Sequence, residues 1–284
     1  TNVDPTEFQL QSGLGTVAVG SVFHEWLVDS LAAGATVFKN AEGFTPNYAD
    51  VTNTARCNNY CQNISAEVKV TDTLRKTVTA GQYSDDMARQ KANAIKVLKN
   101  RIEASLMAGT IANGSSTEAR GMAGLKDTGH WDDVAGHAIL TTSPSGVSLS
   151  ETMLNDYFSN TWNGSGTSIK EAYMGSTLKR RISGFTAGST KNIDSEDKRL
   201  TNAVDVYESD FGIVKLFLHR YANQGATDND LVMLDPEMAK IGFLVRPEYK
   251  EAAKTGSFTG GWYETEATLQ VNDPRAVHVV KRLK

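Results

Sequence analysis

Cysteine is scarce in this sequence, since Cys57 and Cys61 are the only two among 284 residues. In an extended strand these thiols would lie about 13 Å apart, which is too far for a disulfide bond. Two thiols without a histidine partner also make a poor metal site. We therefore expect free thiols and a fold of one or two domains that needs no disulfide bonds.

The chain also lacks an apolar run of about 18 residues, a secretory signal and a basic excess. Its 33 acidic residues outnumber its 29 Lys and Arg, which gives a net charge of −4. A protein that holds nucleic acid by neutralising phosphates carries a basic excess instead. We therefore expect a globular chain without a membrane span and without sequence-specific binding to DNA.

Complete catalytic motifs are missing, and no phosphate-binding or dinucleotide-binding glycine pattern supports a cofactor. The Ser176-Thr177-Leu178-Lys179 segment, followed by Lys254-Thr255-Gly256, has the order found in penicillin-interactive serine hydrolases. The Ser-Asp-Asn element of those enzymes is absent. The sequence favours a protein that is not an enzyme, and a hydrolase using Ser176 and Lys179 remains an alternative.

A short segment gathers residue types that bind metals. It contains His130, Asp132, Asp133 and His137. The spacing of the two histidines matches no compact metal motif, so we interpret the segment as a solvated loop and expect no metal.

A long amphipathic helix is the strongest local signal. It is predicted over residues 84–108, with Ser84 as N-cap and Gly109 after its end. Its apolar stripe comprises Ala88, Ala92, Ile95, Leu98, Ile102 and Leu106. Of these, Ile95, Leu98, Ile102 and Leu106 are the predicted core contacts. The helix would be roughly 37 Å long, which is typical of a strut across a flat body.

An extended β-hairpin is predicted over residues 22–78, from alternating strands at 22–28 and 66–78 around a long polar segment. Large and polar side chains in it are candidates for contacts with another subunit. They are Trp26, Phe38, Phe44, Tyr48, Arg56 and Tyr60. A lone hairpin cannot bury its aromatic residues well, so we interpret this region as an interface.

The remaining segments predict an α+β protein. Residues 1–21 show little periodicity and indicate an extended arm, whereas residues 146–240 alternate helices and strands as one unit. Strands near residues 241–245, 262–271 and 276–283 close the chain. We expect the last strands to return to the part that carries the long helix.

Short stretches in this order resemble the major capsid proteins of tailed bacteriophages with the Hong Kong 97 type fold. The stretches are His24-Glu25-Trp26 with Asp29, Arg56 with Asn59-Tyr60 and Gln62, Arg101-Ile102-Glu103-Ala104, Gly121 with Gly124-Leu125, Ser183-Gly184-Phe185, Val204-Asp205-Val206-Tyr207 with Ser209-Asp210-Phe211-Gly212, Leu234-Asp235-Pro236, Val245-Arg246-Pro247, Ala253-Lys254-Thr255-Gly256 and Thr268-Leu269-Gln270-Val271. The resemblance covers nearly the whole chain. It implies an N-terminal arm (1–21), an extended hairpin or E-loop (22–78), a peripheral domain (79–145) with a spine helix (84–108), an axial domain (146–240) and C-terminal strands returning to the peripheral domain (241–284).

The resemblance also implies a function. Hexamers and pentamers of the chain would form an icosahedral shell around double-stranded DNA, in a virion assembled in the bacterial cytoplasm. The implied partners are further copies of the chain, a portal protein, and scaffold or decoration proteins. An encapsulin-like bacterial compartment shell shares the fold and remains an alternative.

Overall fold

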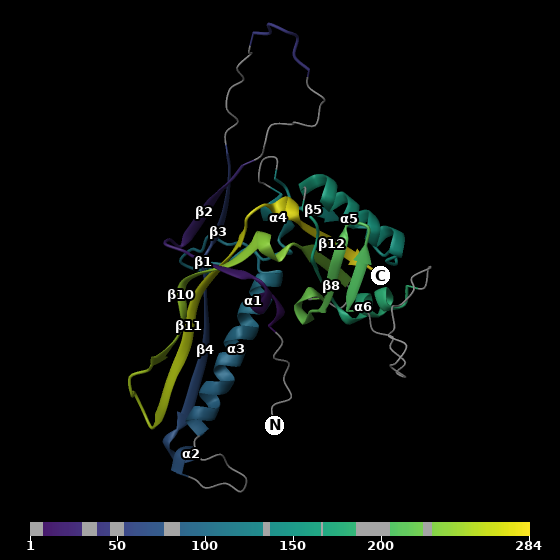
Figure 1. The fold of residues 1–284 in the computed structure, drawn as a ribbon. Coiled ribbons are helices and arrows are strands. Elements are labelled where there is room, and N and C mark those ends of the chain that lie inside the picture. The colour runs from purple at the N-terminus through teal and green to yellow at the C-terminus, as the bar shows by residue number, and fades with distance from the viewer. Residues whose placement is uncertain are drawn as a thin grey trace.

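The computed structural model describes residues 8–29, 39–45, 54–76, 86–132, 137–165, 167–185, 205–223 and 229–284. These residues form a mixed α+β structure with a four-stranded sheet, a six-stranded sheet and a two-stranded hairpin (Figure 1). None of the helices in the described part of the chain combines the length and apolar character needed to cross a membrane.

The four-stranded sheet carries the long helix α3 (Asp86–Ala108) on one face (Figure 1). Its strand order is β1 (Gly15–Ala18), β10 (Ala239–Glu251), β11 (Phe258–Val271) and β4 (Gln62–Thr71). Alternate residues of β4 are buried, because successive side chains of a strand point to opposite faces. The buried set is Ile64, Ala66, Val68 and Val70, and it joins the core cluster of α3.

The core face of α3 differs in part from the predicted stripe. Leu98, Ile102 and Leu106 are buried, whereas Ile95 is half-buried. Ala88 and Ala92 are exposed, and their place in the core is taken by Met87 and Ala94. Lys91 belongs to the face that meets the sheet, because its ammonium lies 4.0 Å from the ring centroid of Tyr249 in β10. Because Lys91 lies on this inner face, the spacing of apolar residues alone predicted the wrong core residues in the first turns of α3.

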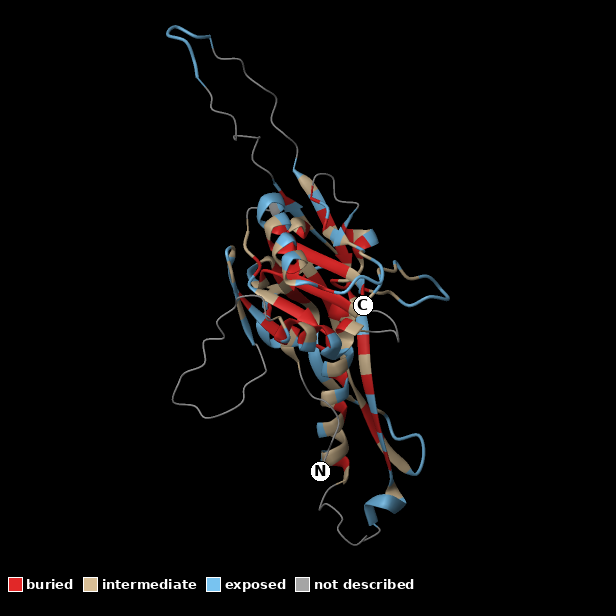
Figure 2. Cartoon of the chain, turned by 90° about the vertical axis from the view of Figure 1, so that its right-hand side faces the viewer, coloured by how far each residue is buried: buried red, intermediate tan, exposed pale blue. Residues whose placement is uncertain are grey.

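The six-stranded sheet is covered on one face by α5 (Glu151–Ser165) and α6 (Ser176–Ser183). Its order is β5 (Leu140–Thr142), β12 (Val277–Leu283), β9 (Asn229–Leu234), β6 (Glu171–Met174), β8 (Gly212–Leu218) and β7 (Val206–Ser209). Leu231 and Met233 of β9 face the helices, whereas Val232 and Leu234 join the core of α3. The two sheets therefore share one continuous interior, seen as the buried centre of the molecule in Figure 2.

Two strands lie elsewhere than the sequence predicted. Strand β12 pairs with β9 in the six-stranded sheet, so only β10 and β11 return to the sheet under α3. The hairpin strand β2 (Phe23–Val28) pairs with β3 (Ala55–Tyr60), and not with the strand predicted at 66–78. Only residues 66–71 of that segment belong to β4, which pairs with β11, whereas Asp72–Lys76 form the short helix α2. The polar composition of residues 55–60 does not predict a strand. Contacts with the rest of the subunit stabilise β3 instead.

The start of the chain is packed on its own subunit within the described residues. Helix α1 (Gln9–Gly13) buries Leu10 completely, and β1 pairs in parallel with β10. Residues 9–18, assigned from sequence to an extended arm, are thus part of the body. The shorter elements are α2 (Asp72–Lys76), α4 (Thr128–Trp131) and the 3-10 turns η1 (Arg220–Asn223), η2 (Pro236–Met238) and η3 (Pro274–Ala276).

Candidate inter-subunit surface on the β2–β3 hairpin

The β2–β3 hairpin has two distinct faces, because exposure alternates along β2. The inward set is His24, Trp26 and Val28, opposite Asn59, Cys57 and Ala55 of β3. The outward set is Phe23, Glu25 and Leu27, opposite Tyr60, Asn58 and Arg56. Both faces carry apolar residues, so the hairpin can pack on its own subunit and still offer an apolar surface outside.

The inward face is bound to the body. Trp26 donates its indole N–H to the carbonyl oxygen of Val271 at 2.9 Å, and its ring lies 6.3 Å from that of Trp131. His24 Nε2 lies 2.8 Å from Gln270 Oε1. These contacts hold Trp26 within its own subunit, although the sequence placed it among the inter-subunit residues.

The outward face exposes large apolar side chains. Leu27 is 64% exposed and Phe23 is 37% exposed. The Phe23 and Tyr60 rings pack against each other in a tilted arrangement, with 4.9 Å between their centroids. Arg56 is exposed opposite Leu27, and it forms no ion pair with any other described residue. The face combines an aromatic pair, an aliphatic side chain and a cation, which is a composition typical of protein interfaces.

The other predicted contact residues lie beyond the paired strands. Phe44 is 53% exposed within residues 39–45, which Figure 1 places well away from both sheets. Phe38 and Tyr48 lie outside the described residues. Phe23 and Leu27 are not among the contact residues predicted from the sequence. Period-two alternation in the segment 23–28 separates them from Trp26 and could have found them.

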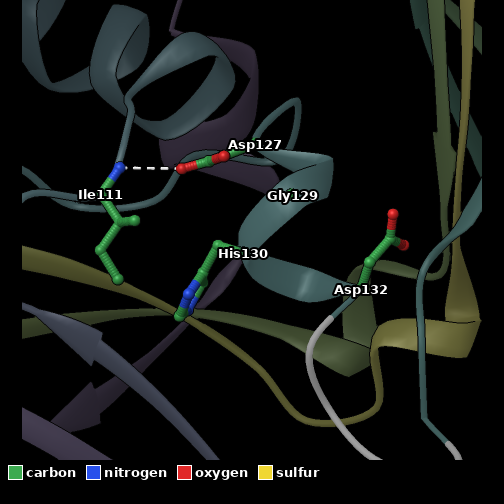
Figure 3. A pocket seen from close by; sticks show the side chains of 5 residues that line it. All are labelled: Ile111, Asp127, Gly129, His130 and Asp132. Atoms are coloured by element: carbon green, nitrogen blue, oxygen red, sulfur yellow. Dashed lines mark hydrogen bonds between the residues drawn. The ribbon is translucent and has the colours of Figure 1, made fainter.

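A surface hollow of about 530 Å³ lies beside the base of the hairpin (Figure 3). Ile111 donates its backbone N–H to Asp127 Oδ2 at 2.8 Å, and His130 Nε2 lies 2.7 Å from the carbonyl oxygen of Asn58. Asp132 extends away from His130 and Asp127 (Figure 3). The polar groups of the hollow therefore do not converge on a common point.

His130 and His137 both contact other parts of the same subunit. His137 is buried and lies 3.4 Å from Asp273 Oδ1, while His130 binds β3. The interpretation of a solvated loop is therefore wrong for both side chains. Within the described ranges, no group of three or more His, Cys, Asp or Glu residues is arranged to hold a metal ion.

The candidate hydrolase lysine has other partners. Lys179 is buried, and its ammonium donates to the carbonyl oxygen of Leu216 at 2.7 Å and to Asp205 at 3.1 Å. Ser176 lies exposed at the start of α6. The ammonium binds a carbonyl oxygen of β8 at a position that β7 does not pair with. It is therefore not available to activate a serine.

Both cysteines are free and buried, in agreement with the sequence. Burial raises the pKa of Cys57 and of Cys61 to about 11, with smaller contributions from nearby carboxylates. The thiols are therefore protonated at neutral pH and act as small apolar side chains under the hairpin.

The architecture matches solved capsid structures along the whole chain. The capsid protein of a native GTA particle aligns with a TM-score of 0.68 at 11% identity, covering 100% of this chain and 93% of that one. The capsid protein of cyanophage A-1(L) aligns with a TM-score of 0.69 at 12% identity, covering 99% and 94%. The SrpI encapsulin of Synechococcus elongatus aligns with a TM-score of 0.58 at 11% identity, covering 100% and 92%. The fold is that of the Hong Kong 97 type capsid proteins.

The sequence matches the family described as SU10 major capsid protein over residues 1–284, and the chain belongs to this family. It is a major capsid protein of tailed phages, a structural component of the icosahedral shell of the virion and not an enzyme. No curated protein sequence matches the chain.

Proposed function

We propose that the chain builds its shell as hexamers and pentamers around double-stranded DNA, and that the outward face of the β2–β3 hairpin contacts the neighbouring subunit. Leu27 carries this proposal, because it is the most exposed large apolar residue of the described chain. An isolated subunit gains nothing from an exposed leucine on a strand whose other face is already packed. Burial of that side chain against a neighbour would contribute roughly 2 kcal/mol to each contact.

The two sheets divide the remaining roles. We propose that α3 and the four-stranded sheet form a peripheral domain, and that the six-stranded sheet forms an axial domain that meets its copies at the centre of each hexamer or pentamer. Val206 and Ile213, both largely exposed on the edge hairpin β7–β8, support this contact. A portal protein and scaffold or decoration proteins complete the proposed set of partners.

The net charge of −4 is consistent with a container for packed DNA. A wall of the same sign as the phosphates does not hold the DNA in place, so the DNA can slide as it enters. An encapsulin-like shell is the second candidate, because the SrpI encapsulin shares the fold. DNA inside particles purified from infected cells supports the proposal, whereas packaged protein without DNA supports the second candidate.

The proposed hairpin contact is tested by Leu27→Asp, with Leu27→Met as the matched control. The aspartate adds a charge to the outward face and leaves the inward contacts of Trp26 and Asn59 unchanged. We expect a folded Leu27→Asp subunit that fails to form closed shells, while Leu27→Met assembles like the wild type. Closed shells of normal size from Leu27→Asp would refute the hairpin contact.

A further inference from the structure

The side chain of Asn59 is a fully buried junction between the hairpin and the body. Its amide nitrogen donates to the carbonyl oxygens of Leu269 at 2.8 Å and Ala123 at 3.1 Å. Its amide oxygen accepts the backbone N–H of Ala123 at 2.9 Å and that of Tyr60 at 2.9 Å. The amide therefore uses both donor hydrogens and both acceptor positions.

The partners of Asn59 connect it to the four-stranded sheet and to the end of α3. Leu269 lies near the C-terminal end of β11. Ala123 lies in a segment that is itself bound to the end of α3, since Leu125 donates its N–H to Leu106 and Gly124 donates its N–H to Gly109. The hydrogen bonds of the Asn59 amide thus fix the position of the hairpin relative to both α3 and the four-stranded sheet.

The geometry of this junction allows one orientation of the hairpin. Hydrogen bonds weaken steeply when their angles change, and a buried amide that loses its partners is strongly unfavourable. The other hydrogen-bonded anchors of the hairpin, at His24, Trp26 and Asn58, involve partly exposed groups that water can replace. Among the hydrogen bonds of the hairpin, those of Asn59 are therefore the most costly to break by a rotation.

We propose that Asn59 is a positioning residue that sets the angle between the hairpin and the α3 body, and through this angle the curvature and diameter of the closed shell. The proposal rests on the hairpin contact with a neighbouring subunit. Asn59 lies in β3, at the base of the hairpin, so a rotation of β2 and β3 about this point changes the direction in which the outward face meets a neighbouring subunit. Subunits that hold their neighbours at variable angles cannot close into shells of one size.

The assembly test compares Asn59→Ser and Asn59→Ala with Leu154→Ala. Leu154 of α5 is completely buried against the six-stranded sheet. Its truncation therefore destabilises the subunit without changing any contact of the hairpin. Particle diameters are measured by electron microscopy. We expect a broad diameter distribution or open sheets from both Asn59 variants, and wild-type diameters from Leu154→Ala. A single wild-type diameter from both Asn59 variants would overturn the proposal.

A distance measurement tests the angle itself in unassembled subunits. Spin labels are attached at Glu25→Cys on the outward face and Val97→Cys on the exposed side of α3, while Cys57 and Cys61 are buried. We expect a narrow distance distribution with Asn59 present, and one at least twice as wide with Asn59→Ser. Equal widths would overturn the proposal. Failure of the wild-type protein to form any shell would instead count against the proposed function.

Discussion

Glu103 Oε1 lies 3.0 Å from His219 Nε2, and both side chains are buried. Glu103 belongs to α3, whereas His219 directly follows β8 of the six-stranded sheet. The same carboxylate accepts the backbone N–H groups of Leu10 and Gln11 and the side-chain amide of Gln11. One carboxylate therefore joins the N-terminal helix, the spine helix and the six-stranded sheet.

Removal of this carboxylate should loosen the start of the chain. Burial alone would raise the pKa of Glu103, but the hydrogen bonds from His219, Leu10 and Gln11 outweigh it and hold the pKa below its usual value. We expect Glu103→Ala to lower the free energy of unfolding by about 3 kcal/mol, since it leaves these donors unpaired. Urea unfolding provides the measurement, with the exposed Glu67→Ala as a control that should cost less than about 0.5 kcal/mol. Equal stability of the two variants would contradict the role of Glu103.

His278 should make the subunit sensitive to acid. Burial lowers the pKa of His278 from 6.5 to about 4, in a site where its ring nitrogens face Thr142, Thr161 and the Tyr157 carbonyl oxygen. Between these pH values the unfolded chain binds a proton that the folded chain does not. Stability is therefore lost as the pH falls, by about 1.4 kcal/mol per pH unit from this group.

The variant His278→Gln tests this linkage. We expect urea unfolding between pH 6.5 and pH 4 to show a weaker pH dependence for His278→Gln than for the wild type. Thr142→Val keeps the imidazole and should keep the wild-type slope. Identical slopes for the wild type and His278→Gln would show that His278 does not titrate as its burial requires.

Leu98 and Val97 are neighbours in α3 with opposite environments. Leu98 is fully buried against the sheet, whereas Val97 is 42% exposed. We expect Leu98→Ala to cost about 3 kcal/mol and Leu98→Asp more, because the latter buries an unpaired charge. Val97→Ala should change stability by less than about 0.5 kcal/mol. Thermal unfolding of the variants gives the ranking, and a melting temperature unaffected by Leu98→Asp would remove Leu98 from the core.

Arg282 offers a stabilising substitution. It is exposed and has a φ of 60°, a left-handed conformation that favours glycine, at the bulge where β12 leaves its register with β9. We expect Arg282→Gly to raise the free energy of unfolding by about 1 kcal/mol. Glu67→Gly, in the regular strand β4, should lower it by a similar amount. A loss of stability in Arg282→Gly would show that its side chain contributes more than its backbone conformation costs.

Local patterns predicted the elements whose residues repeat regularly. The α3 helix and the alternation of β4 follow from apolar spacing. Gly109 comes directly after the helix, and glycine is required there because a Cβ would lie 2.5 Å from the Ser105 carbonyl oxygen and 2.6 Å from that of Met122. The resemblance to capsid proteins came from colinear short stretches and is confirmed by the family match.

Several features depend on tertiary contacts that the spacing of apolar residues does not show. The sequence of β3 is polar and does not predict a strand. The strand forms nevertheless, since the Asn59 amide is hydrogen-bonded inside the protein and Arg56 faces solvent. Lys179 is buried for a similar reason, since the Leu216 carbonyl oxygen and Asp205 replace water around its ammonium. The choice of sheet for β12 depends on which neighbours cover both of its apolar faces, and a single strand does not encode this.

Cryo-electron microscopy of particles formed by the purified wild-type chain shows directly what covers the Leu27 side chain in the shell. We expect closed icosahedral shells in which the outward face of each β2–β3 hairpin is covered by a neighbouring subunit. Discrete small oligomers, or closed shells with that face open to solvent, would contradict this expectation.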